Sequence, residues 1–220
     1  MQLISIIMPY YRKINSVNRT IKSVIKQTYK KFELIIVYDD ETAEDYHKIK
    51  KFIANNKKIR IIKNRKNIGA GQSRNIGIKN SNGSIVTFID SDDTWHPQKL
   101  KKQLNFLNKN NHNFIFCGYK KIFKKKSIEV NIDSEYLSYK DLLKSCEIGL
   151  STVMIKKKII DNNLFSNLKT QEDFAAWLKI TKKHNAFFLN EVLVNWYDTE
   201  NSLSSNFFQK LFDAYKVFYL

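Results

Sequence analysis

The sequence predicts an α/β fold in which a mostly parallel sheet carries helices on both faces. In the first half of the chain, four short apolar runs alternate with segments whose apolar residues recur at helical spacing. This alternation is typical of parallel sheets with helical crossovers. Polar residues directly follow three of the runs. Ligands bind at the carboxyl ends of the strands in such sheets, so we expect these three positions to converge on one site.

Local signals define the elements of the first half. The first strand is expected at residues 3–8, closed by Pro9, and the next helix buries Val17 and Ile21 after Ser16 as its N-cap. Continuous apolar runs predict strands that are buried on both faces, and the segments between them each have one apolar side. The further strands are expected at residues 32–37, 59–62 and 85–89, and the further helices around residues 46–53 and 70–79.

The second half is less regular. Residues 119–132 alternate enough to predict a hairpin. No repeat, low-complexity linker or Gly/Pro-rich hinge divides the chain, so we expect a single domain over residues 1–220. Further strands are expected at residues 113–118, 152–155 and 192–196, helices at 139–146 and 171–183, and an amphipathic, aromatic-rich segment at 207–220.

The composition is strongly basic. Lysine and arginine number 38 against 21 aspartates and glutamates, which gives a formal net charge of +17. Lysine clusters of this kind could bind anionic lipid headgroups, nucleic acid or an acidic substrate. The alternative is a general bias toward Lys, Asn and Ile, with the lysines on solvated faces. The two clusters are Lys120, Lys121, Lys124, Lys125, Lys126 and Lys156, Lys157, Lys158.

Length and residue order favour a cytoplasmic protein with a sizeable core. The chain has 220 residues and is 43% hydrophobic, and it contains no apolar stretch near the roughly 20 residues that span a bilayer. Residues 1–16 lack the order of regions found in a signal peptide. Cys117 and Cys146 lie far apart and match no metal-binding spacing, as expected for free thiols in a reducing compartment.

Three carboxylates follow the fourth apolar run. They are Asp90, Asp92 and Asp93, with Ser91 between the first two. A buried strand cannot leave these charges in the core, so they must face a cation or solvent at its end. Their oxygens suit Mg²⁺ or Mn²⁺, which usually keeps open positions for the phosphates of a substrate. The alternative is an acidic turn that caps a helix starting near Pro97.

Five short motifs occur in a fixed order along the chain. They are SIIMPYY from Ser5, FELIIVYDD from Phe32, NIGAGQSRN from Asn67, FIDSDDTWHP from Phe88 and QED from Gln171. Each alone is a weak signal, but five in register are specific. In this order and spacing the chain resembles family 2 glycosyltransferases, which are inverting enzymes with the GT-A fold. The resemblance implies a Rossmann-like, nucleotide-sugar-binding half at residues 1–93 and an acceptor-binding half with the catalytic base at residues 94–220.

The resemblance implies a site for the nucleotide base. Pro9 and Tyr11 resemble the residues that flank the base, where an aromatic ring offers a stacking face. Asp39 resembles the carboxylate that accepts a hydrogen bond from the base. Tyr38 and Asp40 stand where the family more often has Asp and Gly, so the choice between Asp39 and Asp40 as the base-reading carboxylate stays open.

The resemblance also implies a diphosphate and metal site. Arg74 resembles a basic residue that offsets the diphosphate charge, the alternative being an arginine on a helix surface. Asp90-Ser91-Asp92 resembles the D-x-D metal signature, extended by Asp93. The implied cofactor, Mn²⁺ or Mg²⁺, bridges the two phosphates and stabilises the leaving nucleoside diphosphate. Asp92 and Asp93 are the expected ligands, whereas Asp90 is expected to contact the ribose or a metal-bound water.

An acidic pair opens the helix expected at residues 171–183. Glu172-Asp173 resembles the family pair whose second residue is the catalytic base, so Asp173 is assigned that role. Displacement at the anomeric carbon needs a carboxylate that takes the proton of the acceptor hydroxyl. The alternative is that both acids only complement the helix dipole.

The chain departs from the family pattern near residue 200. Tyr197 stands where a Tyr-Arg pair of the family has its Arg, and Thr199 stands where a His often precedes Glu-Asn-Ser-Leu-Ser. The departure removes a diphosphate contact or a metal ligand in members that use one. The sequence therefore predicts the fold more firmly than the activity.

We interpret the sequence as a metal-dependent inverting glycosyltransferase of the hexosyl or N-acetylhexosaminyl type. The expected donor is a UDP-sugar, and the expected acceptor is a hydroxyl of a glycan or lipid-linked glycan in bacterial surface polysaccharide or lipooligosaccharide synthesis. The basic clusters suggest peripheral contact with an anionic inner membrane face. The alternatives are an inactive sugar-nucleotide-binding scaffold, a nucleotidyltransferase without its usual Gly-rich loop, and a basic nucleic-acid-binding protein without a recognisable RNA-binding motif.

Overall fold

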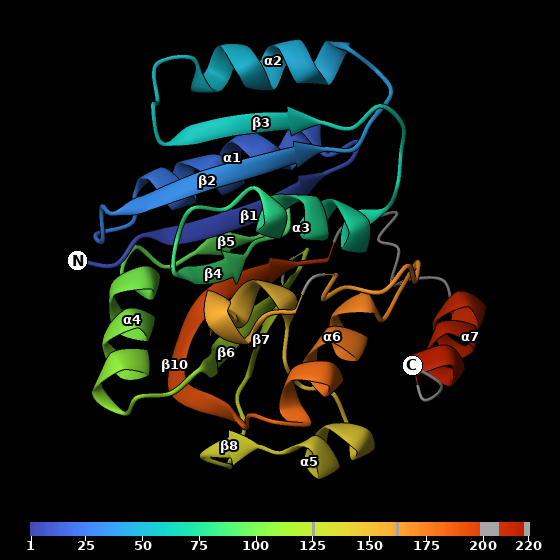
Figure 1. Cartoon of the computed structure of the whole chain (residues 1–220). Helices are drawn as coiled ribbons and strands as arrows, with labels where there is room; N and C mark the ends of the chain where they lie inside the picture. The colour runs from blue at the N-terminus through green and yellow to red at the C-terminus, as the bar shows by residue number, and fades with distance from the viewer. Residues whose placement is uncertain (125, 162, 199–206, 218–220) are drawn as a thin grey trace.

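The chain folds around one mixed sheet. A computed structural model describes residues 1–124, 126–161, 163–198 and 207–217. These residues form a ten-stranded sheet with the order β3-β2-β1-β4-β9-β6-β10-β5, while β7 pairs with β6 and β8 pairs with β10. The predicted α/β class is confirmed (Figure 1).

The first four strands are parallel, as predicted. The prediction that Pro9 closes the first strand is wrong, because the strand continues to Tyr10. Pro9 lies beyond Ile7, the last residue of this strand that pairs with β4, so its missing N–H removes no ladder bond on that side. The strands are β1 (Ile4–Tyr10), β2 (Phe32–Tyr38), β3 (Ile59–Lys63) and β4 (Ile85–Phe88).

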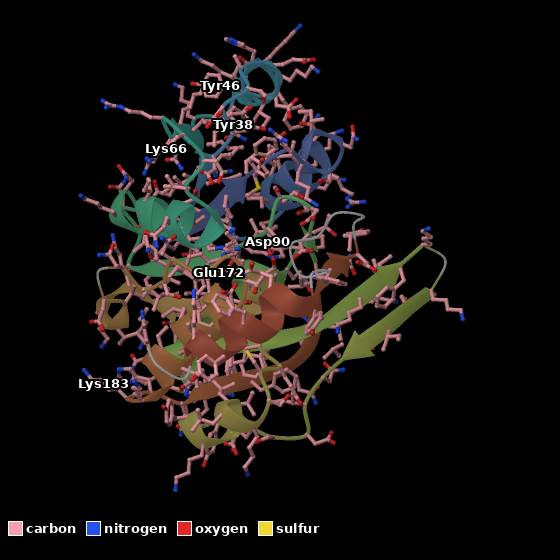
Figure 2. All side chains as sticks on the ribbon, turned by 90° about the vertical axis from the view of Figure 1, so that its right-hand side faces the viewer. Tyr38, Tyr46, Lys66, Asp90, Glu172 and Lys183 are labelled. Atoms are coloured by element: carbon pink, nitrogen blue, oxygen red, sulfur yellow. The ribbon has the colours of Figure 1, made fainter. Side chains whose placement is uncertain are left out.

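The strands of the second half include both directions. β9 is antiparallel to β4 and to β6, and β10 is parallel to β6. The predicted hairpin is formed by β6 and β7 and extends away from the body of the domain (Figure 2). The strands are β5 (Thr94–Trp95), β6 (Phe114–Phe123), β7 (Lys126–Val130), β8 (Tyr136–Leu137), β9 (Met154–Lys156) and β10 (Ala186–Tyr197).

The helices occur where the sequence predicts them, with shifted ends. The first begins at Ile14, with Lys13 as its N-cap, so the prediction of Ser16 as the cap is wrong. The Ser16 hydroxyl lies within the helix and donates to the carbonyls of Lys13 and Ser91. The helices are α1 (Ile14–Ile25), α2 (Glu44–Ile53), α3 (Ala70–Lys79), α4 (Lys99–Lys109), α5 (Tyr139–Lys144), α6 (Glu172–Thr181) and α7 (Phe207–Val217), with 3-10 turns η1 (Leu150–Thr152) and η2 (Lys157–Ile159).

Two hydrophobic cores lie on the two faces of the sheet. One core joins the buried faces of α1, α2 and α4 to residues such as Ile6 and Met8. The other joins α3, α5 and α6, which contributes the fully buried Trp177, to Ile7 and Phe88. Successive residues of β1 thus contribute to opposite cores, as expected for a strand covered on both faces.

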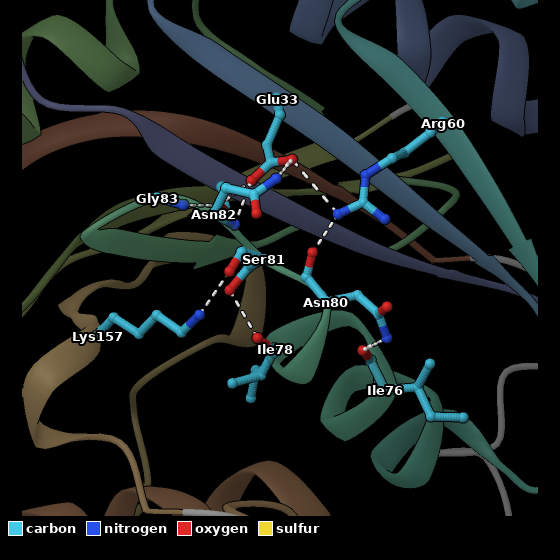
Figure 3. A network of polar contacts seen from close by, with 10 residues as sticks. Glu33, Arg60, Ile76, Ile78, Asn80, Ser81, Asn82, Gly83 and Lys157 are labelled. Atoms are coloured by element: carbon cyan, nitrogen blue, oxygen red, sulfur yellow. Dashed lines mark hydrogen bonds and ion pairs between the residues drawn. The ribbon is translucent and has the colours of Figure 1, made fainter.

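A polar network links neighbouring elements at the edge of the sheet where the parallel strands begin (Figure 3). Glu33 of β2 accepts hydrogen bonds from the Ser5 hydroxyl at 2.7 Å and from the backbone N–H of Asn82 at 2.6 Å. Arg60 of β3 pairs with Glu33 and donates to the carbonyl of Asn80. The network holds the turn between α3 and β4 against β2 and β3, which leaves the opposite edge for the site.

We predict that Gly77→Ala destabilises the fold. Gly77 lies in α3 against β1, and an added Cβ would overlap the Cγ2 atom of Ile7, which is fully buried. Overpacking costs about 1–3 kcal/mol, which exceeds the gain of up to about 1 kcal/mol that alanine brings over glycine in a helix. Denaturant unfolding should show a net loss of about 1–2 kcal/mol.

Gly149→Ala is the matched control. Its added Cβ would meet neighbours only at 3.5 Å or more, which is ordinary contact. The free energy of unfolding should change by less than about 0.5 kcal/mol. Equal effects of the two substitutions would contradict the close packing of α3 on β1.

Candidate active site

The structure brings the three polar strand ends together, as predicted. The carboxyl ends of β1, β2 and β4 lie at one edge of the sheet, which faces the viewer in Figure 2. After β1, the Lys13 ammonium lies 3.0 Å from the Asp92 carboxylate, and the Arg12 guanidinium lies 3.7 Å from Asp40. Tyr11 is 43% exposed at this edge, with its ring beside Arg12.

Asp39 is buried and holds the loop before α3. One carboxylate oxygen accepts from the Asn64 amide at 2.8 Å and from the N–H of Ile68 at 3.0 Å. The other oxygen accepts from the N–H of Gly69 at 2.8 Å. Gly69 has a φ of 87°, a conformation that suits glycine. Both oxygens of the Asp39 carboxylate therefore already accept hydrogen bonds from groups of the protein.

Asp40 is also buried, but one of its oxygens lacks a hydrogen bond. Its Oδ1 accepts from the N–H of Thr42 at 3.1 Å, whereas its Oδ2 has no hydrogen-bond partner and faces the exposed Arg12 side chain. A buried, unsatisfied carboxylate oxygen is costly unless a ligand supplies a donor. Asp40 therefore differs from Asp39 in having one oxygen without a hydrogen-bond donor, and the choice between the two as the base-reading carboxylate stays open.

Aromatic rings border this part of the edge. The rings of Tyr10 and Tyr38 stack with centroids 5.0 Å apart, and Tyr46 meets Tyr38 edge-on at 5.4 Å. The Tyr10 hydroxyl donates to Asp45 at 2.6 Å. Tyr38, which replaces the Asp of the family pattern, is thus part of the packing between β1, β2 and α2 (Figure 2).

The carboxylate loop, residues 90–93, presents its acids to different surroundings. The Asp92 side chain is 17% exposed and pairs with Lys13. Asp93 is buried, and its two oxygens accept from the Ser151 hydroxyl at 2.6 Å and from the N–H of Tyr197 at 3.3 Å. Burial, reinforced by Asp90 and Asp92, raises the pKa of Asp93 well above its usual value. Asp93 therefore ties the loop to the interior, and Asp92 is the better placed of the two expected metal ligands.

Sequence reasoning missed the residues that support this loop. The Ser151 hydroxyl also accepts from the N–H of Asp90 at 3.1 Å. From α1, Thr20 donates to the carbonyl of Asp93 at 2.7 Å, and Arg19 donates to the carbonyl of Asp92 at 2.9 Å. None of these three residues lies in a motif that marks it, because each acts through contacts distant in sequence.

Arg74 connects the carboxylate loop to α6. Its guanidinium is 4% exposed and pairs with Asp90 at 2.8 Å and with Glu172 at 2.6 Å, and these two acids lie close together in Figure 2. Burial alone would lower the pKa of Arg74, but the two carboxylates outweigh burial and raise it. The alternative of an arginine on a helix surface is wrong. Because both terminal nitrogens are engaged, the assignment of Arg74 to the donor diphosphate stays a prediction.

Asp173 lies half-buried in the first turn of α6, beside this bridge. Burial, reinforced by the negative charge of Glu172, raises the pKa of Asp173 to about 7, although Arg74 acts in the opposite direction. Gln171, directly before the helix, has a φ of 62°. Such left-handed conformations are uncommon outside glycine and occur often at functional sites.

The structure describes one of the two residues that depart from the family pattern, Tyr197. The Tyr197 ring lies at the end of β10, with the Arg19 guanidinium 3.6 Å from its centroid. A cation from α1 thus lies over the residue that replaces the expected arginine. Thr199 lies outside the described residues.

The carboxylate oxygens at this edge fit a hard divalent ion only together with further ligands from a substrate. Among the residues that the structure describes, no three His, Cys, Asp or Glu side chains are grouped as a metal cage. Mg²⁺ commonly binds through one or two carboxylates together with the phosphates of a substrate. Asp92, a partly exposed carboxylate next to the strand ends, fits that mode.

Comparisons with known proteins agree with this arrangement. A family model described as Glycosyl transferase family 2 matches residues 5–179. The chain is 32% identical, over 95% of its length and 82% of the relative's, to UDP-Glc:alpha-D-GlcNAc-diphosphoundecaprenol beta-1,3-glucosyltransferase WfgD of Escherichia coli.

Two solved structures share the fold. TarS of S. aureus, in complex with UDP-GlcNAc, superposes with a TM-score of 0.83 at 21% identity, over 99% of this chain and 64% of that one. The mannosyltransferase PcManGT of Pyrobaculum calidifontis, in complex with GDP-Man and Mn²⁺, gives 0.71 at 13% identity, over 94% and 60%. The fold is thus the GT-A fold of nucleotide-sugar transferases. The chain belongs to glycosyltransferase family 2, which decides against the nucleotidyltransferase alternative.

Proposed function

We propose that this chain is a metal-dependent, inverting glycosyltransferase that transfers a sugar from a UDP-sugar to a hydroxyl of a lipid-linked glycan in bacterial surface polysaccharide synthesis. The observation that carries the proposal is a carboxylate with a raised pKa, Asp173, beside the Arg74 bridge to the carboxylate loop. The name of the Escherichia coli relative contains a UDP-sugar donor and a lipid-linked GlcNAc acceptor, which supports the substrate classes. The UDP-GlcNAc bound to TarS supports UDP as the nucleotide.

In this proposal Asp173 is the general base. It takes the proton of the acceptor hydroxyl while the new bond to the anomeric carbon forms and the bond to the nucleoside diphosphate breaks. A base is most effective when its pKa lies near the working pH, and burial gives Asp173 that property. Arg74, through Glu172, positions the first turn of α6 so that Asp173 keeps its place.

The donor is held at the ends of β1, β2 and β4. We assign Asp40 to the nucleotide base, since its Oδ2 lacks a hydrogen-bond partner, and Tyr11 and Pro9 to the walls around the base. Asp92 is the proposed ligand of Mn²⁺ or Mg²⁺, with Asp90 and Ser91 beside it. The ion would offset the charge that develops on the leaving diphosphate.

We predict that the activity of the wild type rises with pH. Because the ionised carboxylate is the base, kcat/KM should increase about tenfold per pH unit below 7 and level off above it. Asp173→Asn should lower turnover by roughly 10²-fold or more and abolish this rise. Sugar transfer across pH 5 to 9 tests both statements.

Glu172→Gln is the comparison variant. The substitution removes the negative charge of Glu172 and frees Arg74 from its ion pair with Glu172. Both effects lower the pKa of Asp173. The rise in activity should therefore move to lower pH.

Wild-type turnover in Asp173→Asn would place the base elsewhere. UDP binding without any transfer, across a broad panel of donors and acceptors, would favour an inactive scaffold.

We predict that measurements of UDP affinity distinguish the metal site from the nucleotide-base site. Asp92→Asn should abolish the gain in affinity that Mn²⁺ brings, because a carboxylate ligand is lost. Asp40→Asn should weaken UDP binding by roughly tenfold with or without the metal, because the amide is a poorer acceptor for the N–H of the base. Calorimetry with Mn²⁺ and with a chelator measures both. Equal affinity in every protein and condition would contradict the assignments.

We further propose peripheral contact with an anionic membrane through the β6–β7 hairpin. The hairpin extends away from the body of the domain (Figure 2), and its Lys124, Lys126 and Ile128 are exposed, whereas Lys125 lies outside the described residues. Among the described residues, no helix combines the length and apolar character of a membrane span. In the aromatic-rich segment at residues 207–220, α7 exposes Phe212 and Tyr215, and we propose that these rings assist the contact.

We predict that Lys124→Gln/Lys126→Gln weakens binding to phosphatidylglycerol vesicles by roughly thirtyfold at low salt, since each lysine near such a surface contributes about 1 kcal/mol. Lys79→Gln/Lys109→Gln removes the same charge from the exposed ends of α3 and α4 and should have little effect. Co-sedimentation at low and high salt measures the difference. Equal binding to anionic and neutral vesicles would rule out this contact.

A further inference from the structure

A cavity lined by cations and aromatic rings lies beside the carboxylate loop. It has a volume of about 490 Å³ and lies between α1 and the segment that follows the loop. Arg19 and Lys22 of α1 and its C-cap residue Lys26 form one side, and Trp95 and Tyr197 contribute aromatic rings. Neither the donor site nor the general base proposed above uses these residues.

The three cations share one face of α1 and its C-cap, which keeps helical backbone angles. Their spacing, three and then four residues, places their side chains one above another along the helix. All three are exposed, and none of the ion pairs between described residues involves them. Like charges so close together repel each other, and an anionic ligand in the cavity would offset this repulsion.

Arg19 is held in place at the mouth of the cavity. Its guanidinium stacks over the Tyr197 ring at 3.6 Å, and its Nη2 donates to the carbonyl of Asp92 at 2.9 Å. Within the described part of the chain this is the one hydrogen bond that Arg19 makes, so its other N–H groups remain for a ligand. A fixed guanidinium fork is suited to phosphate oxygens.

We propose that this cavity binds the diphosphate of a lipid-linked acceptor. The inference rests on the proposed function, in which the acceptor is a lipid-linked glycan, and the name of the Escherichia coli relative gives a diphosphate as the link to the lipid. Such an acceptor brings a second diphosphate near the donor, and the cations of α1 offset its charge. The position fits, because Arg19 contacts the same loop whose Asp92 is assigned to the donor metal.

The test compares Lys22→Gln/Lys26→Gln with Lys79→Gln/Lys109→Gln, which removes two exposed lysines elsewhere and keeps the net charge equal. The first acceptor is GlcNAc-diphosphate on a farnesyl chain, and the second is an alkyl GlcNAc without phosphate. The pocket variant should raise KM for the charged acceptor by roughly tenfold or more and leave KM for the uncharged acceptor within about twofold. UDP affinity with Mn²⁺ should stay at the wild-type value.

Direct binding separates this inference from the proposed function. If no protein transfers sugar, calorimetry with the farnesyl-diphosphate acceptor and with inorganic pyrophosphate still measures the pocket, and weaker binding in Lys22→Gln/Lys26→Gln alone supports it. Unchanged KM and unchanged binding overturn the inference. It is also overturned if the pocket variant loses UDP affinity, which would assign the cations to the donor. Loss of affinity only for phosphatidylglycerol vesicles overturns it as well, and would make the cavity a membrane contact.

Discussion

The buried charge of Arg74 constrains the whole site. A guanidinium that is 4% exposed must be paired, because an isolated charge in the interior is very costly. Asp90 and Glu172 supply that pairing, and they come from the end of β4 and from the first turn of α6. The carboxylate loop and the acidic pair are therefore held at a fixed separation. The Arg74 side chain also packs against the Phe165 ring at 5.4 Å, which fixes the guanidinium from the side.

The same constraint gives the neighbouring acids Glu172 and Asp173 different surroundings. Glu172 lies in the ion pair, whereas Asp173 accepts from the N–H of Phe174, and burial and the charge of Glu172 outweigh the effect of Arg74 on its pKa. The left-handed Gln171 before them sets the direction in which the helix starts. A carboxylate with a raised pKa beside an ion pair is a common arrangement in catalytic sites. Here adjacent positions of one helix provide it, because Glu172 pairs with Arg74 and Asp173 has the raised pKa.

The sequence predicted the parts of the fold that local pattern controls. Apolar runs marked the parallel strands, and the acids after β2 and β4 marked the edge at which the site forms. It did not predict which acids face inward. Asp93 is buried because Ser151 and the backbone of Tyr197 supply donors, and neither contact is visible as a local pattern. The same limit applies to Asp39 and Asp40, whose difference arises from the loop before α3, and to Arg19, whose partner on β10 is distant in sequence.

The supports of the carboxylate loop have a consequence for folding. Asp93 bonds to Ser151, 58 residues later, and to Tyr197, 104 residues later. Closing such long loops costs chain entropy that only late packing repays, which slows the formation of nonlocal contacts. During synthesis the β1–β4 core can assemble early, while the loop acquires its last support only after residue 197 has been made. A nascent chain would therefore contain the sheet edge before it holds the aspartates in their final arrangement.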